Sequence, residues 1–382
     1  MRTLQIGKFY PIKGGVEKVM WDLTLGLATK GVKSDMLCAC IDEKMPHGGV
    51  LTPVPGARVI CVPTLFKASS TMISPAMVLK FRSLLKQAVA EGEPYDVVHI
   101  HHPDPMACLA LFLSGYKGKL VLHYHSDILG KGIIYKLYRP LEKWLLRRAD
   151  LIVGTSPVYT EASPVLKDVQ NKITTLTIGV EDKSVGIDAA KVEAIRKRFG
   201  DCHLVFSLGR LIPYKGYKYL VDAAKYLDDS FKIVIGGSGP LHSELESQII
   251  SYGLQDKVFL EGFISDEDLP SWYGACDIYC MSSVMKTEAF GIVQVEAMSC
   301  SRPLVATTIP ESGVSWVNAA GISGLNVPPE DPEALADAFR RITDSEELYK
   351  SLSEGSRKRY EELFVPEKMI NDCISIYERI NK

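Results

Sequence analysis

Short apolar runs alternate along the chain with longer segments in which apolar residues recur at helical spacing. Up to residue 180 the pattern predicts strands at 4–7, 35–41, 58–62, 96–101, 120–125, 151–155 and 173–178, and helices at 16–30, 77–90 and 135–148. From residue 204 it predicts strands at 204–208, 232–236, 258–261, 278–281, 303–307 and 324–327, and helices at 217–226, 241–252 and 266–275 followed by three more. Such alternation is typical of parallel sheets joined by crossover helices, so we predict an α/β fold.

The length of the chain indicates two domains. Its 382 residues exceed the size at which a single hydrophobic core usually stops growing. The segment 181–190 is polar and poor in strand signals, so we expect Rossmann-like, doubly wound domains at 1–180 and 181–365. Open α/β sheets bind ligands outside the carboxyl ends of their strands. The two domains are therefore expected to face each other across a ligand-binding cleft.

The bulk properties exclude several other classes of protein. The formal net charge of −2 gives no general attraction for nucleic acid. No apolar run reaches the roughly 18 residues of a membrane-spanning helix, and the strand pattern starting at Thr3 leaves no room for a signal peptide. The 9 cysteines show no repeated Cys-x-x-Cys spacing, which favours reduced thiols over disulfides or a zinc site. We therefore expect a cytoplasmic protein.

Two carboxylates flank a predicted strand-to-helix turn within residues 287–298. Glu288 lies in the loop, Gly291 opens the helix, and Glu296 falls in the second helical turn. The free N–H groups of a helix start carry partial positive charge and bind anions such as a diphosphate. Carboxylates repel phosphate and suit hydroxyl groups instead, such as those of a ribose or a sugar. The turn therefore predicts a nucleotide-sugar site, against the alternative of two unrelated structural acids.

Cations and glycines stand at further predicted strand ends. Arg210 and Lys215 follow the first strand of the second domain, where both would reach the ligand side of the sheet. They would neutralise a diphosphate leaving group, as a metal ion does in other enzymes; the alternative is a pair of ordinary surface cations. Gly14 and Gly15 open the first helix, and paired glycines let a ligand approach the backbone closely.

Five of the histidines gather on two predicted strands, at positions 99, 101, 102, 123 and 125. They would serve as core residues, as a metal cluster completed by Asp104 and Asp127, or as groups that face a substrate. We favour a substrate-facing role for His125, which ends its strand, and a structural role for His123. His101 and His102 stay undecided between these roles.

Three other motifs are weaker. The glycines in 236–239 resemble half of a dinucleotide fingerprint but lack its third glycine, so they make a poor case for a dehydrogenase. The acidic triplet 266–268 is expected at a helix start rather than at a metal. The helix at 135–148 mixes basic and aromatic residues, which suits either an anionic membrane surface or ordinary packing.

The segments Glu288-Ala289-Phe290-Gly291 and Glu296-Ala297-Met298 resemble the Glu-x7-Glu motif of the "group 1" retaining GT-B glycosyltransferases. The resemblance covers nearly the whole chain and is strongest over residues 207–307. It implies that Glu296 holds the ribose hydroxyls and that Glu288 faces the donor sugar. It also implies roles for residues elsewhere in the chain: Arg210 and Lys215 at the diphosphate, the backbone at Phe290, Gly291, Ile292 and Val293 around it, Ile264 at the base, Gly15 near the reacting centre, and His125 at the sugar.

The resemblance further implies a reaction. The sequence from His125 to Ile128 is similar to bacterial mannosyl- and related transferases of surface-polysaccharide assembly, which makes GDP-mannose the first-choice donor and a UDP-hexose the second. The expected enzyme is retaining and needs neither metal nor cofactor. Its acceptor would be a lipid-linked or growing glycan at the inner membrane face, and its last helix, 366–382, would complete the first domain.

Two departures from the family pattern accompany the resemblance. Thr177-Ile178-Gly179-Val180 stands where the family often has Pro-Asn-Gly-Val, and Cys300-Ser301-Arg302-Pro303 lacks the usual glycine. Two other functions stay open. One is a GT-B-type sugar-nucleotide epimerase, which would need no acceptor. The other is a binding module that keeps the nucleotide site without turnover.

Overall fold

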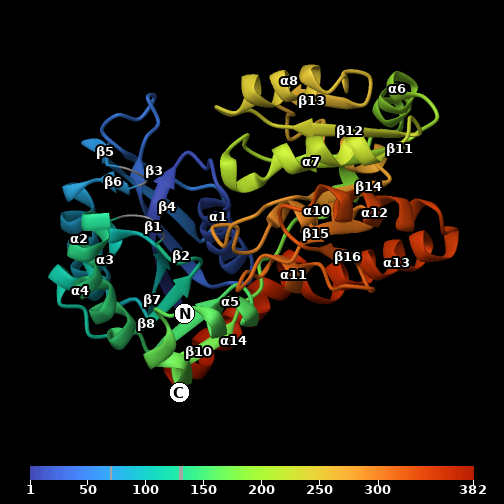
Figure 1. The fold of residues 1–382 in the computed structure, drawn as a ribbon. Coiled ribbons are helices and arrows are strands. Elements are labelled where there is room, and N and C mark those ends of the chain that lie inside the picture. Colours follow the sequence, from blue (N-terminus) through green and yellow to red (C-terminus); the bar gives the residue numbers. More distant parts are fainter. Residues whose placement is uncertain (69–70, 129–131) are drawn as a thin grey trace. The chain divides into compact units, whose positions relative to one another are not determined.

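The computed structural model describes residues 1–68, 71–128 and 132–382 (Figure 1). The chain divides into two compact units. The first unit comprises Met1–Gly179 together with Pro366–Lys382, and the second comprises Val180–Val365. Each unit is built around its own sheet, so each is an α/β structure of the kind that the alternating pattern predicts.

The sheet of the first unit has the strand order β10-β9-β8-β7-β1-β2-β4-β3, and among its described pairs only β3 runs antiparallel to its neighbour. Its strands are β1 (Arg2–Tyr10), β2 (Lys33–Cys40), β3 (Gly49–Leu51), β4 (Ala57–Pro63), β7 (Val97–His102), β8 (Lys119–Tyr124), β9 (Leu151–Gly154) and β10 (Ile173–Thr175). A separate hairpin pairs β5 (Phe66–Ala68) with β6 (Thr71–Ile73). The central strands β1, β7 and β8 are almost wholly buried because helices cover both faces of the sheet.

Helices pack on this sheet as two groups. Helix α1 (Gly15–Thr29) packs against the C-terminal helix α14 (Pro366–Asn381), and Gly26 allows the contact, since a Cβ there would meet Ile370 Cδ1 at 2.2 Å. Helices α2 (Pro75–Ala90), α3 (Pro105–Ser114) and α4 (Gly132–Arg148) pack one against the next (Figure 1). Short segments α5 (Pro157–Ala162) and η1 (Lys167–Lys172) precede β10. Helix α14 is thus part of the first unit, although the second unit separates it in sequence.

The second unit contains a parallel sheet with the strand order β13-β12-β11-β14-β15-β16. Its strands are β11 (His203–Leu208), β12 (Phe231–Gly236), β13 (Val258–Gly262), β14 (Ile278–Met281), β15 (Leu304–Thr307) and β16 (Gly324–Val327). Its helices are α6 (Ala189–Phe199), α7 (Tyr217–Ala223), α8 (His242–Ser251), α9 (Leu269–Ala275), α10 (Ile292–Ser299), α11 (Val314–Val317), α12 (Pro332–Thr343) and α13 (Glu346–Leu363). Three single turns, η2 (Lys183–Gly186), η3 (Pro213–Lys215) and η4 (Ala224–Tyr226), complete it.

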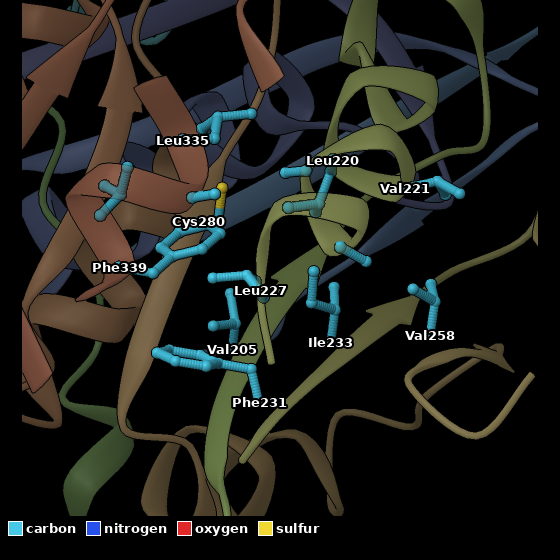
Figure 2. Packing of buried hydrophobic residues seen from close by; sticks show 14 of the residues in the cluster. Val205, Leu220, Val221, Leu227, Phe231, Ile233, Val258, Cys280, Leu335 and Phe339 are labelled. Carbon is cyan, nitrogen blue, oxygen red and sulfur yellow. The ribbon is translucent and has the colours of Figure 1, made fainter. Parts of the chain in front are cut away.

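Buried aliphatic and aromatic side chains fill the space between this sheet and helices α7 and α12. Figure 2 shows Val205, Ile233 and Cys280 from three strands facing Leu220 of α7 and Phe339 of α12, all fully buried. Truncating a residue such as Phe339 to alanine in a core of this density costs about 3–5 kcal/mol. The packing holds the carboxyl ends of β11 and β14 in fixed positions, and the loops that follow them carry Lys215 and Glu288.

Local structure differs from the sequence prediction in several places, since β3, the β5–β6 hairpin and α5 were not predicted. Helix α9 begins at Leu269 rather than at residue 266, because Pro270 favours the first helical turn and Asp268 forms an ion pair with Lys191 at 2.6 Å. Strand β10 ends at Thr175. Helix α3 was missed although Asp104 caps it, accepting from the N–H groups of its first turn. Helix α6 begins inside the segment read as a polar boundary.

Within the described ranges, no helix combines the length and the apolar character that crossing a membrane requires.

Candidate functional site

The loop after β14 brings a lysine and a glutamate of the predicted site together in the second unit. Lys215, from the turn after β11, places its Nζ 2.6 Å from Oε2 of Glu288. Both side chains are mostly buried, at 12% and 13% exposure. Ser283 also donates to the Glu288 carboxylate at 3.3 Å. The pair is therefore held in place, and a cation stands beside the start of helix α10.

The start of α10 offers backbone N–H groups without a side-chain cap. Gly291 occupies the N-cap with φ 80°, in the left-handed region that favours glycine. A Cβ at Gly291 would meet Gln294 Nε2 at 2.6 Å and Met281 Sδ at 2.7 Å, so the tight turn needs glycine for space as well. No side chain caps the helix, and Ile292 and Val293 are partly exposed. This geometry gives a diphosphate both N–H donors and the helix dipole.

Glu296 is oriented by a tyrosine that sequence reading missed. The Tyr273 hydroxyl donates to Glu296 Oε2 at 2.7 Å. Burial, with the nearby Glu296 carboxylate, raises the pKa of Tyr273 well above its ordinary value, so the tyrosine stays a donor. One carboxylate oxygen of Glu296 is thereby fixed. A carboxylate held in this way suits the ribose hydroxyls, which are neutral hydrogen-bond donors.

Glycines let the backbones at the ends of β11 and β12 approach closely. A Cβ on Gly237 would lie 2.0 Å from the Gly209 oxygen, and one on Gly239 would lie 2.5 Å from the Leu211 oxygen. The glycine-rich run that resembles half of a dinucleotide fingerprint therefore has a packing reason. Arg210 stands in this tight turn as an exposed side chain, and among the described residues it forms no ion pair. Its guanidinium is free to meet a ligand.

The side chains of two other predicted donor-site residues pack against neighbouring residues. Ile264, in the loop after β13, packs its Cδ1 over Gly236, where a Cβ would meet it at 2.6 Å. The Phe290 ring is buried and makes an edge contact with Phe364, with ring centroids 5.9 Å apart. The Phe290 side chain is thus part of the core, so any contact with a ligand would have to come from its main chain.

The predicted residues of the first unit stand at strand ends of its sheet. Gly15 begins α1, which has no side-chain cap, and a Cβ on the preceding Gly14 would meet Glu17 Oε2 at 2.5 Å. His125 follows β8 directly and is only 5% exposed. Its Nε2 lies 3.0 Å from Nδ1 of His101. The structure therefore places His125 inside a buried polar network rather than on an open surface.

Four histidines form a stack on one face of the sheet. The rings of His123 and His125 lie 4.0 Å apart at an angle of 15°, and those of His99 and His101 lie 4.8 Å apart at 13°. Burial, as the largest cause, lowers the pKa of His99, His101 and His125 well below 6.5 and that of His123 to about 3. These rings are therefore neutral at physiological pH.

Nitrogen atoms of His99, His101 and His123 lie within 4.8 Å of one another, which is close enough to consider a metal ion. The nearly parallel rings do not point their lone pairs at one place, as coordination requires. Both nitrogens of His101 already have hydrogen-bond partners. The two aspartates considered as further ligands have other partners. Asp104 caps α3, and Asp127 accepts a hydrogen bond from the Tyr124 hydroxyl. His99 Nε2 and both ring nitrogens of His123 have no hydrogen-bond partner among the described residues. The arrangement is therefore a partly hydrogen-bonded stack of neutral rings and not a coordination sphere.

His102 points away from this stack. Its Nε2 lies 3.0 Å from Glu142 of α4, and both side chains are buried. Its ring also stacks on Tyr124 at 4.7 Å. Alternation along β7 explains the separation, since neighbouring residues of a strand face opposite sides of the sheet. His102 therefore belongs to the packing between β7 and α4.

Comparison with known proteins gives consistent matches over the whole chain. The family model "Glycosyl transferases group 1" matches residues 190–359, and "Glycosyltransferase Family 4" matches residues 13–181. The O-antigen chain mannosyltransferase C of Escherichia coli is 32% identical over 379 residues, which cover 99% of this chain and 98% of that protein. The D-rhamnosyltransferase WbpZ of Pseudomonas aeruginosa is 32% identical over 367 residues, covering 95% and 92%. Among solved structures, sucrose-phosphate synthase from Thermosynechococcus elongatus matches with a TM-score of 0.78 at 23% identity, covering 99% of this chain and 98% of that one.

Proposed function

The chain belongs to the group 1 glycosyltransferases, and we propose that it transfers mannose from GDP-mannose, with retention of configuration, to a lipid-linked or growing polysaccharide. Its two Rossmann-like units have the GT-B fold. Two relatives that align over nearly their whole lengths carry the names of a mannosyl- and a rhamnosyltransferase, which favours a donor sugar of this kind.

One observation carries the proposal: a lysine–glutamate pair stands beside an uncapped helix start. Lys215 and Glu288 are 2.6 Å apart, and Gly291 opens α10 without a side-chain cap. A diphosphate would receive N–H donors from Ile292 and Val293 and positive charge from Lys215 and from the exposed Arg210. Glu296, fixed by Tyr273, would accept from the ribose hydroxyls.

The proposed chemistry is electrostatic and needs no metal ion. As the bond between the anomeric carbon and the diphosphate breaks, negative charge grows on the leaving oxygen, and Lys215, Arg210 and the helix start stabilise it. The acceptor oxygen forms its bond on the same face of the sugar. Its proton passes to the leaving phosphate oxygen, so no protein nucleophile takes part. Glu288 and His125 are assigned to the donor sugar, as the family resemblance implies.

Helix α4 supports an acceptor that lies at an anionic membrane. Ile133 and Leu137 are 76% and 78% exposed near the start of the helix. Four exposed basic side chains share the helix with them: Lys136, Arg139, Lys143 and Arg147. An apolar strip beside a basic strip suits a headgroup region, where each cation contributes about 1 kcal/mol.

Co-sedimentation with vesicles tests this part of the proposal. Wild-type protein should bind vesicles that contain phosphatidylglycerol and should release from them at high salt. A variant with Leu137→Ser and Lys143→Glu should bind them weakly. Equal binding of both proteins, or equal binding to purely zwitterionic vesicles, would remove α4 as the membrane contact.

Thermal unfolding in EDTA tests the donor site. A ligand at about 100 times its Kd stabilises the folded state by about 2.7 kcal/mol, which for a unit of this size raises the Tm by roughly 5–10 °C. We expect GDP and GDP-mannose to give this rise without added metal, and Lys215→Ala to abolish it. Lys225→Ala is the matched control, since Lys225 pairs with Asp222 on the surface of the same unit.

Three other results would change the assignment. A rise with UDP and UDP-hexoses alone would move the donor to a uridine nucleotide. Isomerised nucleotide-sugar in the absence of any acceptor would identify an epimerase. If no nucleotide changes the Tm, or if the effect needs a divalent metal, the diphosphate site proposed at Lys215 and α10 is wrong.

A further inference from the structure

A chain of buried hydrogen bonds links the C-terminal helix to His125. The side-chain nitrogen of Gln5 in β1 donates to the Tyr377 hydroxyl of α14 at 2.9 Å. The oxygen of the same amide lies 2.9 Å from Nε2 of His101. The other ring nitrogen of His101, Nδ1, lies 3.0 Å from Nε2 of His125. Tyr377, Gln5 and His101 are completely buried, so water does not compete for these bonds.

The Gln5 amide sets the direction of the bonds. An amide oxygen only accepts, so the proton between Gln5 and His101 sits on Nε2 of His101. Burial, helped by nearby histidines and by Lys8, lowers the pKa of His101 well below 6.5, so its ring is neutral and carries one N–H. Its Nδ1 is therefore bare and accepts a hydrogen bond. His125 must then donate from its own Nε2.

The same reasoning leaves one nitrogen of His125 as a free acceptor. Burial also lowers the pKa of His125, so a proton on Nε2 leaves Nδ1 bare. This Nδ1 makes no hydrogen bond to any described residue. The fully buried nitrogens of the stack that lack a partner belong to His99 and His123, so Nδ1 of His125 is not one of them. A bare nitrogen of this kind accepts a hydrogen bond from a hydroxyl.

The Tyr377 hydroxyl fits the Gln5 amide in this orientation. Its hydroxyl accepts from Gln5 and also lies 2.6 Å from Nδ1 of His99, to which the phenolic proton can be donated. Turning the amide over would reverse every bond of the chain and would place a proton on Nδ1 of His125. The opposite orientation would thus present a donor to the ligand instead of an acceptor.

We propose that Tyr377, Gln5 and His101 are positioning residues that hold the proton of His125 on Nε2, so that its Nδ1 accepts a hydrogen bond from a hydroxyl of the donor sugar. The identity of the ligand rests on the proposed function, whereas the position of the proton rests on the buried contacts alone. The C-terminal helix, which is far from His125 in sequence, thereby helps to set what His125 offers to the sugar.

NMR of the free wild-type protein with ¹⁵N-labelled histidine tests the proton position directly. The two ring nitrogens differ in chemical shift according to which one carries the proton, and the His125 signals are identified by their loss in His125→Asn. We expect His125 to be neutral with its proton on Nε2. A proton on Nδ1, or an even mixture of the two forms, would overturn the proposal whatever the enzyme transfers.

Variants then test the positioning role. Gln5→Met removes both polar atoms at similar volume, so we expect His125 to become a mixture of two forms and kcat/KM for the donor to fall about tenfold, the value of one good hydrogen bond. Tyr377→Phe should act in the same direction. The affinity for GDP, which lacks the transferred sugar, should stay unchanged in both variants.

Tyr95→Phe is the matched control, because it removes another buried hydroxyl of the first unit, one that donates to Asp35. It should leave the His125 proton position and kcat/KM unchanged. The proposed positioning role is wrong if Gln5→Met leaves His125 in a single tautomeric form. It is also wrong if Tyr95→Phe changes the position of the His125 proton equally. If no nucleotide binds to any variant or to the wild type, the proposed function fails while the proton position still stands or falls by the NMR result.

Discussion

The two units of this glycosyltransferase present their polar groups in opposite ways. In the second unit the groups are charged, as with the mostly buried Lys215–Glu288 pair and the exposed Arg210. In the first unit they are neutral and buried, as with His101 and His125. Fixed charges suit a charged diphosphate, whereas neutral oriented groups suit hydroxyls, whose recognition depends on hydrogen-bond direction. Under the proposed function, the second unit would hold the diphosphate and the neutral groups of the first unit would recognise the sugar.

Lowering the pH should have the largest effect on the difference between the two units. It should destabilise the first unit, because the buried histidines lie there. The folded-state pKa values of His99, His101, His123 and His125 are lowered, so below about pH 6.5 the unfolded state binds protons that the folded state does not. The free energy of unfolding of the first unit should therefore fall as the pH falls, by about 1.4 kcal/mol per histidine and pH unit. In the second unit, Asp182, whose pKa is lowered from 3.8, acts only at lower pH.

Tryptophan fluorescence during urea unfolding measures the two units separately. Replacing Trp272 and Trp316 by phenylalanine leaves Trp21 and Trp144 to report on the first unit, and the converse pair of substitutions reports on the second. We expect a steep loss between pH 6.5 and about 5.5 in the first unit only. Parallel loss in both units would show that the buried stack is not the cause.

Replacing Lys215 tests the role of the charged groups in the second unit. Lys215→Ala takes away the cation beside the helix start and should lower kcat about 10²–10³-fold, the effect of removing one preorganised donor to a developing charge. Lys225→Ala should leave kcat within about threefold. Steady-state kinetics with GDP-mannose compares the two. A Lys215 variant as active as its control would mean that the diphosphate binds elsewhere.

Tyr273 tests how strongly Glu296 depends on its partner. Tyr273→Phe removes a hydrogen bond to a charged group, worth about 1.5–3 kcal/mol, and should raise the KM for the donor by at least about tenfold. Tyr360→Phe is its control, since the Tyr360 hydroxyl donates to the Val180 oxygen in the same unit. Both variants should lose some stability, but only the first should lose donor affinity. An equal KM in the two variants would contradict the role given to Glu296.

The smallest expected effect on folding is that of Arg210. Its exposed side chain has no ion-pair partner among the described residues, so Arg210→Ala should change the free energy of unfolding by no more than about 0.5 kcal/mol. It should nevertheless weaken GDP binding about tenfold in calorimetry, because a charge-assisted contact is lost. A large loss of stability would mean that Arg210 has a structural partner and is not free for the ligand.

The sequence alone places the residues around the start of α10 more closely than it places the buried histidines. Glu288, Gly291 and Glu296 are neighbours along the chain, and the spacing of a turn and a helix fixes how they meet. The contact between Gln5 and Tyr377 joins residues 372 positions apart, and it depends on how α14 returns to the first sheet. No local pattern contains that information. Sequence periodicity likewise found most strands of the two large sheets, but it missed β3 and helix α3, whose cap by Asp104 is a signal that was present.

The roles of the histidines also could not be predicted from local sequence alone. Alternation along a strand puts His99 and His101 on one face and His102 on the other, where it meets Glu142. The parallel register of β7 and β8 then pairs His101 with His123 and completes the stack. Register is a property of two strands together, so the sequence of either strand alone leaves the roles of these rings open.

Hydrogen exchange of the free and GDP-bound enzyme, in EDTA, tests the central claim most directly. If the second unit holds the diphosphate, GDP should slow exchange in peptides that span residues 209–216 and 288–296, above all at the amides of Ile292 and Val293. Peptides from β7 and β8 should be unchanged, because GDP lacks the transferred sugar that His125 is proposed to contact. Slower exchange confined to β7 and β8, or no change at the start of α10, would contradict the account.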